Sequence, residues 1–232
     1  MPGLRESAAH AFVDDLDAPV LSDDDRHHLE RVLRLRPGAQ VTVSDGAGRW
    51  RLCRFGDSLE PVGDVVIGIR PSPPITVAVA LTKGERLDWA VQKLTELGVD
   101  GIVPLAAARS VVRWDGDRAA HHVERLRRIA RQAAMQSRRT WLPAVDELRE
   151  FAELVALTGA ALAEPGGEPP SLARPLVLVG PEGGWAEEEA AAALPSVGLG
   201  PTVLRTETAA VAAGALLCGL RERLVGPSDQ DT

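Results

Sequence analysis

The chain has 232 residues, 45% of them hydrophobic and 25% charged, which is enough to bury the core of one large or two small domains. Its apolar stretch at 209–220 is too short to span a bilayer, and we expect no secretory signal in the charged N-terminus. Only Cys53 and Cys218 occur, and the five histidines are not spaced as metal ligands. These features argue against a membrane span, a disulfide framework and a metal site, and they predict a cytoplasmic protein.

The N-terminal part predicts a small β-rich domain with one helix. Short apolar runs separated by turn residues predict strands at 41–44, 49–55 and 65–69. Ser22 is a good N-cap for a helix over His27–Leu35, which stops before Pro37. Three prolines between 71 and 74 then end regular structure. We therefore expect a β-barrel-like domain over residues 1–72.

After the prolines, the pattern changes to strands that alternate with helices. The expected strands are 75–81, 101–105, 160–163, 176–179 and 202–204. The expected helices are 85–97, 117–137, 186–194 and 207–224. Such alternation predicts a parallel sheet with helices on its faces. We expect this second domain to cover residues 73–226 and to be followed by a disordered tail at 227–232.

Two loops near the C-terminus have the composition of a ligand site. Gly180–Gly184, with the sequence GPEGG, follows an expected strand, and its three glycines allow the backbone to approach a ligand closely. Leu199–Thr208 leads into four polar residues at the start of the last helix. Either loop alone is better explained as an ordinary turn, but two loops at adjacent strand ends favour a ligand site, because α/β folds bind their ligands there. Neither has the glycine pattern of a dinucleotide site or a P-loop.

The net charge of −7 is unevenly distributed along the chain. Residues 73–145 carry 12 basic and 7 acidic residues, whereas 146–232 carry 5 and 14. On the expected helix 117–137 the apolar residues share one face and arginines gather on the other. Glu124 is the only acid between 118 and 139, so we expect these arginines to lack partners. The basic face favours an anionic partner such as RNA, while a solvated helix face explains the same pattern equally well.

Several strings stand out by their order and spacing. They are HLERVLR at 28–34, QKLTELGVD at 92–100, RSVV at 109–112, QSRR at 136–139, GPEGG at 180–184 and LRTETA at 204–209. Together they resemble the ribosomal small-subunit methyltransferase E family over nearly the whole chain. The resemblance implies a PUA-like β-barrel followed by an α/β domain of the SPOUT type, whose C-terminal segment forms a trefoil knot. It also implies a homodimer.

The resemblance implies an activity as well. This family transfers a methyl group from S-adenosylmethionine to N3 of a uridine in the decoding region of 16S ribosomal RNA, within the 30S subunit. The two loops would then hold the cofactor, through Leu178, Gly180, Pro181, Glu182, Gly183, Gly184, Leu199, Gly200, Leu204, Arg205, Thr206 and Thr208. The chain departs from the usual family residues at Met135, Arg138 and Thr202, which concerns RNA contacts rather than the cofactor site.

The chemistry of methyl transfer to uridine suggests further roles. Uridine N3 carries a proton at neutral pH, so a proton acceptor or an anion-stabilising group is needed. Arg205 would stabilise charge on the uracil carbonyls, and Glu182 or Glu207 would accept the proton or orient Arg205. Local roles for both carboxylates, such as helix capping, are equally consistent with the sequence. The candidates for phosphate contacts are Arg109, Arg113, Arg127, Arg131, Arg138 and Arg139.

Three other functions fit parts of the sequence. A SPOUT enzyme that acts on another ribosomal or transfer RNA nucleotide would keep the same fold. A ribosome-assembly factor without catalysis would keep it too, although the intact loop glycines argue against this. An NAD-dependent oxidoreductase would fit the alternation of strands and helices, but the chain lacks the required glycine fingerprint.

Overall fold

The computed structural model describes residues 2–226, which divide into two compact units. The first contains the described residues up to Arg70 together with Arg131–Leu142. The second contains Pro71–Ala130 and the described residues from Pro143 onward. Residues 131–142, which the sequence pattern placed in the second domain, therefore pack with the first. The expected disordered tail at 227–232 lies outside the described residues.

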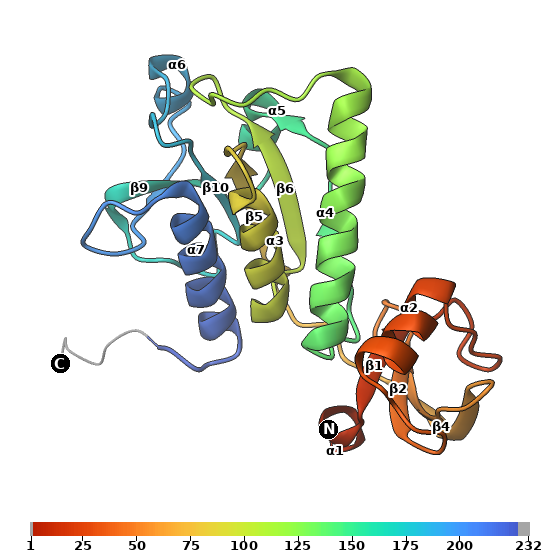
Figure 1. Cartoon of the computed structure of the whole chain (residues 1–232). Helices are drawn as coiled ribbons and strands as arrows, with labels where there is room; N and C mark the ends of the chain where they lie inside the picture. Colours follow the sequence, from red (N-terminus) through yellow and green to blue (C-terminus); the bar gives the residue numbers. More distant parts are fainter. Residues whose placement is uncertain (1, 227–232) are drawn as a thin grey trace. The chain divides into compact units, whose positions relative to one another are not determined.

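The first unit is built on a four-stranded sheet with the order β1-β2-β3-β4 (Figure 1). β1 runs parallel to β2, and the other neighbours are antiparallel. Its elements are α1 (Pro2–Glu6), β1 (Ala9–Phe12), α2 (Asp23–His27), the π-helical turn η1 (His28–Val32), β2 (Gln40–Ser44), β3 (Arg49–Arg54) and β4 (Glu60–Ile67). The three predicted strands are thus confirmed with shifted ends, whereas β1 was missed because all four of its residues are buried and do not alternate.

The predicted helix of this unit begins earlier than expected. The Ser22 hydroxyl accepts a hydrogen bond from the Asp25 backbone N–H (3.1 Å), as an N-cap does, and the helix begins at Asp23. It continues as the π-helical turn and ends at Val32, three residues before the predicted end.

His10 of β1 is buried in the first unit. Its Nε2 donates to the backbone carbonyl of Arg139 (3.0 Å), and its Nδ1 lies 2.9 Å from the Thr42 hydroxyl. Burial lowers the pKa of His10 from 6.5 to about 4, aided by the charges of Arg138 and Arg131 and opposed by the bond to the carbonyl. His10 is therefore neutral in the folded protein at neutral pH.

This depressed pKa predicts a loss of stability in mild acid. Between pH 6.5 and 4 the unfolded chain binds the His10 proton and the folded chain does not, so the free energy of unfolding falls with pH in this window. The expected contribution is roughly 3 kcal/mol across the window and none above it. Urea unfolding at pH 7.5 and pH 5 measures it. His10→Gln, which does not titrate, should show a smaller difference between the two pH values; an equal difference would contradict the assignment.

The second unit contains a seven-stranded sheet with the order β11-β9-β10-β5-β6-β7, in which β8 also pairs with β6. All its neighbouring strands are parallel, which confirms the predicted α/β class. The strands are β5 (Thr76–Ala80), β6 (Gly101–Ala106), β7 (Ala144–Val145), β8 (Arg149–Glu150), β9 (Ala160–Glu168), β10 (Leu176–Val179) and β11 (Ser196–Val197). The helices are α3 (Arg86–Leu97), α4 (Gly116–Gln136), α5 (Phe151–Val155), α6 (Glu187–Ala190) and α7 (Thr206–Arg221).

One predicted strand of this sheet is wrong. Residues 202–204 form no strand, and the edge strand after β9 is instead β11, at Ser196–Val197. Thr202 and Val203 are exposed and follow Pro201, which has no backbone N–H to pair in a sheet. The segment is therefore a loop that leads directly into α7.

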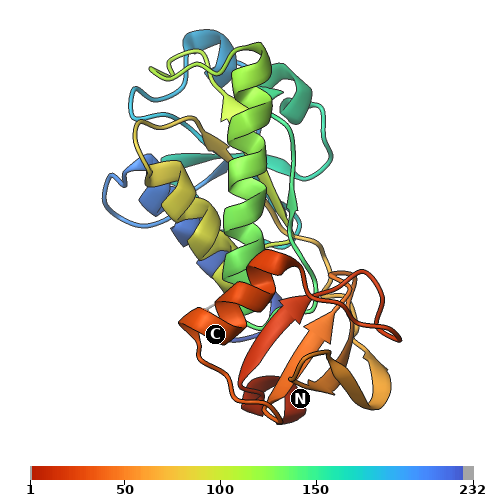
Figure 2. The same ribbon diagram turned by 45° about the vertical axis from the view of Figure 1, so that its right-hand side comes forward.

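Helices cover both faces of the sheet, each over its own hydrophobic cluster. Apolar residues of α3, α4 and α7 join Val77, Val79, Val177 and Val179 in one cluster. Figure 2 shows α3 and α4 side by side on that face. Leu154 of α5 and Trp185 join Leu176 and Leu178 in the other cluster. No helix within residues 2–226 is long and apolar enough to cross a membrane.

A buried ion pair joins the end of α7 to Asp100, the residue directly before β6. The side chains of Arg221 and Asp100 are 4% and 6% exposed and pair with each other. Asp100 Oδ2 also accepts the Ile75 N–H (2.9 Å), and Arg221 Nη2 donates to the Gly98 carbonyl (2.9 Å). Both charges therefore have several partners, which a buried pair requires to offset its desolvation.

Removal of one partner should be strongly destabilising. Arg221→Met leaves the Asp100 carboxylate buried without its counter-charge, and we expect the free energy of unfolding to fall by about 3–5 kcal/mol. The control is Lys93→Met, which breaks a surface pair with Glu96 (2.8 Å) on α3 and should cost less than about 1 kcal/mol. Urea denaturation measures both variants. Equal small losses would show that the buried pair contributes no more than a surface pair.

Candidate functional site

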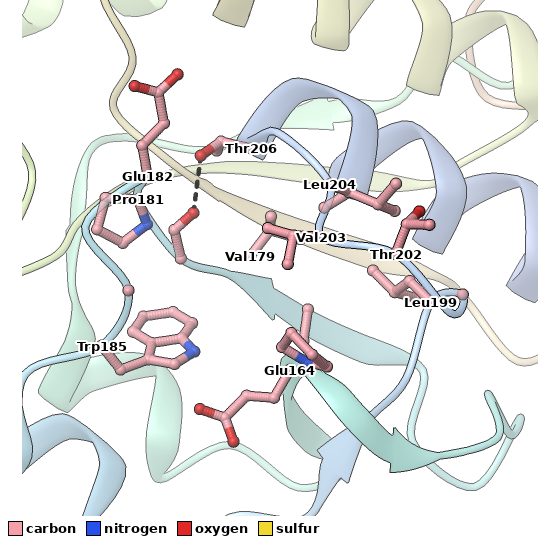
Figure 3. A pocket seen from close by; sticks show the side chains of 16 residues that line it. Glu164, Val179, Pro181, Glu182, Trp185, Leu199, Thr202, Val203, Leu204 and Thr206 are labelled. Atoms are coloured by element: carbon pink, nitrogen blue, oxygen red, sulfur yellow. Dashed lines mark hydrogen bonds between the residues drawn. The ribbon is translucent and has the colours of Figure 1, made fainter.

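A pocket of about 220 Å³ lies at the end of β10 and beside the middle of β9 in the second unit. Its walls are the end of β10 with the GPEGG loop, the loop at 199–204 with the start of α7, and Ala163–Pro165 of β9. The parallel strands bring these segments to the same edge of the sheet. Figure 3 shows Trp185 and Glu164 on one side of the pocket and Leu199, Thr202 and Leu204 on the other.

A hydrogen bond joins the two loops that the sequence singled out. The Thr206 hydroxyl at the first residue of α7 donates to the backbone carbonyl of Gly180, at 3.0 Å (Figure 3). Thr206 is buried, so this bond satisfies a hydroxyl that water does not reach. The first turn of α7 is thereby attached to the end of β10.

The glycines of the pocket are there for two different reasons. A Cβ on Gly180 would lie 2.9 Å from Trp185 Cε2, closer than real Cβ atoms approach, so only glycine fits beside the indole ring. Gly184 has φ +69°, a backbone conformation that other residues rarely adopt, and open space lies where its Cβ would be. The loop is therefore both bent and narrow where it borders the pocket.

Eight of the twelve predicted cofactor residues line this pocket. They are Gly180, Pro181, Glu182, Gly184, Leu199, Gly200, Leu204 and Thr206. Four do not. Leu178 points into the hydrophobic cluster on the opposite face of the sheet from its neighbour Val179, and Gly183, Arg205 and Thr208 are exposed outside the lining.

The sequence analysis missed the rest of the lining. The missed residues are Ala163, Glu164, Pro165, Val179, Trp185, Thr202, Val203 and Ala209. Val179, Trp185 and Ala209 adjoin predicted residues, so a wider window around each string would have included them. Ala163–Pro165 carried no local signal, because their place in the pocket depends on β9 pairing with β10.

Two of the three predicted catalytic residues meet through an arginine that the sequence analysis did not select. Arg86, the first residue of α3, pairs through Nη1 with Glu182 Oε1, and its Nε lies 3.9 Å from Glu207 Oε1. The Glu207 side chain is only 14% exposed, and its Oε2 is buried without a hydrogen-bond partner within residues 2–226. Arg205, in contrast, is exposed at the N-cap of α7.

The predicted arginine face is largely paired. Arg127 contacts Glu124 and Glu147, and Arg131 makes two bonds to Asp25, at 3.0 and 2.8 Å. The expectation that these arginines lack partners is therefore wrong: Glu124 pairs with Arg127 on the same helix, while Glu147 and Asp25 lie 20 and 106 positions from the arginines that they bind. Arg138 donates to the backbone of Leu4 and Ser7, and the Arg139 carbonyl binds His10.

The remaining two arginines of the predicted set lie after β6. Both are exposed, and among residues 2–226 they bind backbone carbonyls: Arg109 that of Gly183, and Arg113 those of Ala107 and Ala108. Arg109 thus lies against the GPEGG loop. Within the described part of the chain, no three histidine, cysteine or carboxylate side chains are grouped to hold a metal ion.

Comparison with known proteins agrees with both units. A family model described as an RNA methyltransferase domain matches residues 70–218, and one described as an RNA methyltransferase PUA domain matches residues 21–58. The chain is 38% identical over 226 residues to the ribosomal RNA small subunit methyltransferase E of Mycobacterium bovis, with 85% of each chain covered.

Solved structures extend the comparison to the fold. The Neisseria gonorrhoeae ribosomal RNA small subunit methyltransferase E bound to S-adenosyl methionine is 27% identical, with a TM-score of 0.76. A Legionella pneumophila methyltransferase in complex with the same cofactor is 26% identical, with a TM-score of 0.78. Each match covers 91% of this chain and 97% of the other. The predicted SPOUT-type α/β fold with a PUA-like first domain is confirmed, and the chain belongs to the ribosomal RNA small subunit methyltransferase E family.

Proposed function

We propose that this protein transfers a methyl group from S-adenosylmethionine to N3 of a uridine in the decoding region of 16S ribosomal RNA, within the 30S subunit. Its family membership supports the coarser activity, methylation of ribosomal RNA with this cofactor. The observation that carries the proposal is the pocket, in which the GPEGG and LRTETA strings form facing walls joined by the bond from Thr206 to Gly180.

The residues that line the pocket are chemically suited to S-adenosylmethionine. Val179, Leu199 and Leu204 offer an apolar surface for the adenine ring, and open space lies where a Cβ on Gly184 would be. Glu164 and Glu182 line the same pocket and are the carboxylates available to the cofactor's cationic and hydroxyl groups. When bound, the cofactor supplies a methyl group on a sulfonium centre. The neutral thioether that remains after methyl transfer is a good leaving group.

The residues of the chain must then orient the uracil and remove its N3 proton. Glu207 is the proposed acceptor, because its Oε2 is buried without a donor next to the pocket. Glu182 is the second candidate, although Arg86 occupies one of its oxygens. Arg205 is exposed at the start of α7, where a guanidinium can stabilise charge on the uracil carbonyls.

We assign the RNA phosphate contacts to the predicted arginines, led by Arg109 and Arg113. These two are exposed and have no carboxylate partner within residues 2–226, and Arg109 lies beside the GPEGG loop. Within the described part of the chain, Arg138 binds backbone and hydroxyl oxygens, whereas Arg127 and Arg131 are already neutralised. Affinity for 30S particles should fall steeply as salt rises, since each phosphate contact releases counterions. A salt-independent affinity would remove the arginines from this proposal.

The decisive test of the function is the modification itself. Mass spectrometry of 16S ribosomal RNA from a deletion strain should show the loss of one 3-methyluridine, and the wild-type gene should restore it. Loss of a different methylated nucleotide would favour the alternative of a SPOUT enzyme with another target. Unchanged RNA with retained cofactor binding would favour an assembly factor.

Three further expectations remain proposals that rest on the family resemblance. A homodimer would be contradicted by a monomeric mass in light scattering at micromolar concentration. A trefoil knot would be contradicted by a crystal structure in which residues 198–205 are not threaded through a loop. A cytoplasmic location would be contradicted by fractionation that finds the protein elsewhere.

A further inference from the structure

Arg86 connects the two loops of the pocket through their carboxylates. It begins α3, after the loop that leaves β5, and its side chain is 40% exposed. Its guanidinium pairs with Glu182 of the GPEGG loop and lies 3.9 Å from Glu207 of the LRTETA string. Glu182 and Arg86 are 96 positions apart in the chain, so no local pattern predicts this contact.

The two carboxylate oxygens of Glu207 have different surroundings. Oε1 faces Arg86, whereas Oε2 is buried and accepts no hydrogen bond within residues 2–226. A buried acceptor without a donor is costly and needs an explanation. Because the two oxygens of a carboxylate are rigidly connected, a charge held at Oε1 also sets the direction of Oε2. An oxygen held in this way is oriented to accept a hydrogen bond or a proton from a ligand.

The charges of Arg86, Glu182 and Glu207 also indicate that Arg86 holds Glu207 in place. Without Arg86, two carboxylates from facing loops would lie close together with no cation between them, and they would repel each other. With Arg86, Glu182 is neutralised directly and Glu207 keeps an ionic contact at longer range. The contact with Arg86 therefore holds Glu207 in place and leaves its buried Oε2 without a hydrogen-bond donor within residues 2–226.

We propose that Arg86 is a positioning residue for methyl transfer, which acts by orienting the Glu207 carboxylate beside the cofactor pocket. This inference rests on the proposed function only in that Glu207 accepts a proton from the RNA base. It applies whichever nucleotide is methylated.

The test compares Arg86→Met, Arg86→Lys, Glu207→Gln and the double variant Arg86→Met/Glu207→Gln. Methyl transfer from tritiated S-adenosylmethionine to unmodified 30S particles gives kcat, calorimetry gives the cofactor Kd, and thermal denaturation reports folding. We expect Arg86→Met to lower kcat about 30-fold with a cofactor Kd within about twofold of wild type. Lysine should restore most of the loss. The double variant should be no slower than Glu207→Gln, because Arg86 acts through Glu207.

Arg149→Met is the matched control. Arg149 is 42% exposed, bridges two carboxylates, Asp146 at 3.1 Å and Glu153 at 3.3 Å, and lies in the same unit outside the pocket lining. Its loss should leave kcat unchanged.

The inference is overturned if Arg86→Met keeps its kcat, if it weakens cofactor binding as much as turnover, or if the losses of the two single variants multiply in the double variant. Should Arg86→Met not fold, the same cycle with Arg86→Gln, which also removes the positive charge, decides.

Two measurements, tritium incorporation and mass spectrometry, separate this inference from the proposed function. Tritium incorporation counts methyl groups on any nucleotide of the particle, whereas mass spectrometry of the wild-type product identifies the nucleotide. A methyl group at another position would contradict uridine N3 and still test Arg86. Normal 3-methyluridine formation with an unaffected Arg86→Met would contradict the role of Arg86 alone.

Discussion

Glu207→Gln is expected to lower kcat for methylation of 30S particles about 100-fold while the cofactor Kd stays within about twofold. Glutamine keeps the size of the side chain but cannot accept the N3 proton as a carboxylate does. Glu207 does not line the cofactor pocket, so its charge should affect the chemical step more than cofactor binding. Steady-state methyl transfer and calorimetry measure the two effects separately.

The control for this prediction is Glu222→Gln. Glu222 lies just after α7 and pairs with Arg221 (3.3 Å), at the end of the helix opposite Glu207, so its replacement should leave kcat near the wild-type value. If Glu207→Gln retained wild-type turnover, the buried oxygen would not be the proton acceptor, and Glu182 would become the remaining carboxylate candidate.

Gly180→Val is expected to weaken cofactor binding by more than about 100-fold. A Cβ at this position would lie 2.9 Å from Trp185 Cε2, and Trp185 is buried and packs against Phe151 (5.3 Å between ring centroids). The ring cannot retreat without disturbing the core, so either it or the valine must fill part of the pocket. Overpacking of this kind also costs about 1–3 kcal/mol of stability. Calorimetry with S-adenosylmethionine measures the affinity.

The matched control is Gly56→Val in the first unit. A Cβ there would come no closer than 3.6 Å to any other atom considered, an ordinary contact with the Ser58 carbonyl, so cofactor affinity should not change. Wild-type affinity in Gly180→Val would mean that Trp185 moves freely or that the cofactor binds elsewhere, and it would contradict the assignment of this pocket.

Local signals account for the elements that the sequence predicted well. The buried apolar run at 176–179 is β10, and the Ser22 cap begins a helix as expected. The glycines at 180 and 184 lie where the backbone is crowded or has positive φ, which is a property of a few consecutive residues. Such features need no knowledge of distant partners.

The errors arise where distant parts of the chain meet. Residues 202–204 have the composition of a strand, but a strand also needs a neighbouring strand to pair with, and none pairs with this segment within residues 2–226. Leu178 was included among the cofactor residues on the family resemblance, but its side chain lies in the cluster on the other face of β10 and does not line the pocket. Arg131 was expected to be unpaired, but its partner Asp25 is 106 positions away.

The sequence by itself determined the family, the parallel α/β class and the two loops that form the pocket, since these depend on strings, periodicity and glycine placement within short windows. Only the tertiary structure decided which residues line the pocket, which arginines are already neutralised, and that Arg86 lies between Glu182 and Glu207. The physical reason is that ion pairs and burial depend on which segments pack together, and strand pairing brings together residues that no local pattern connects.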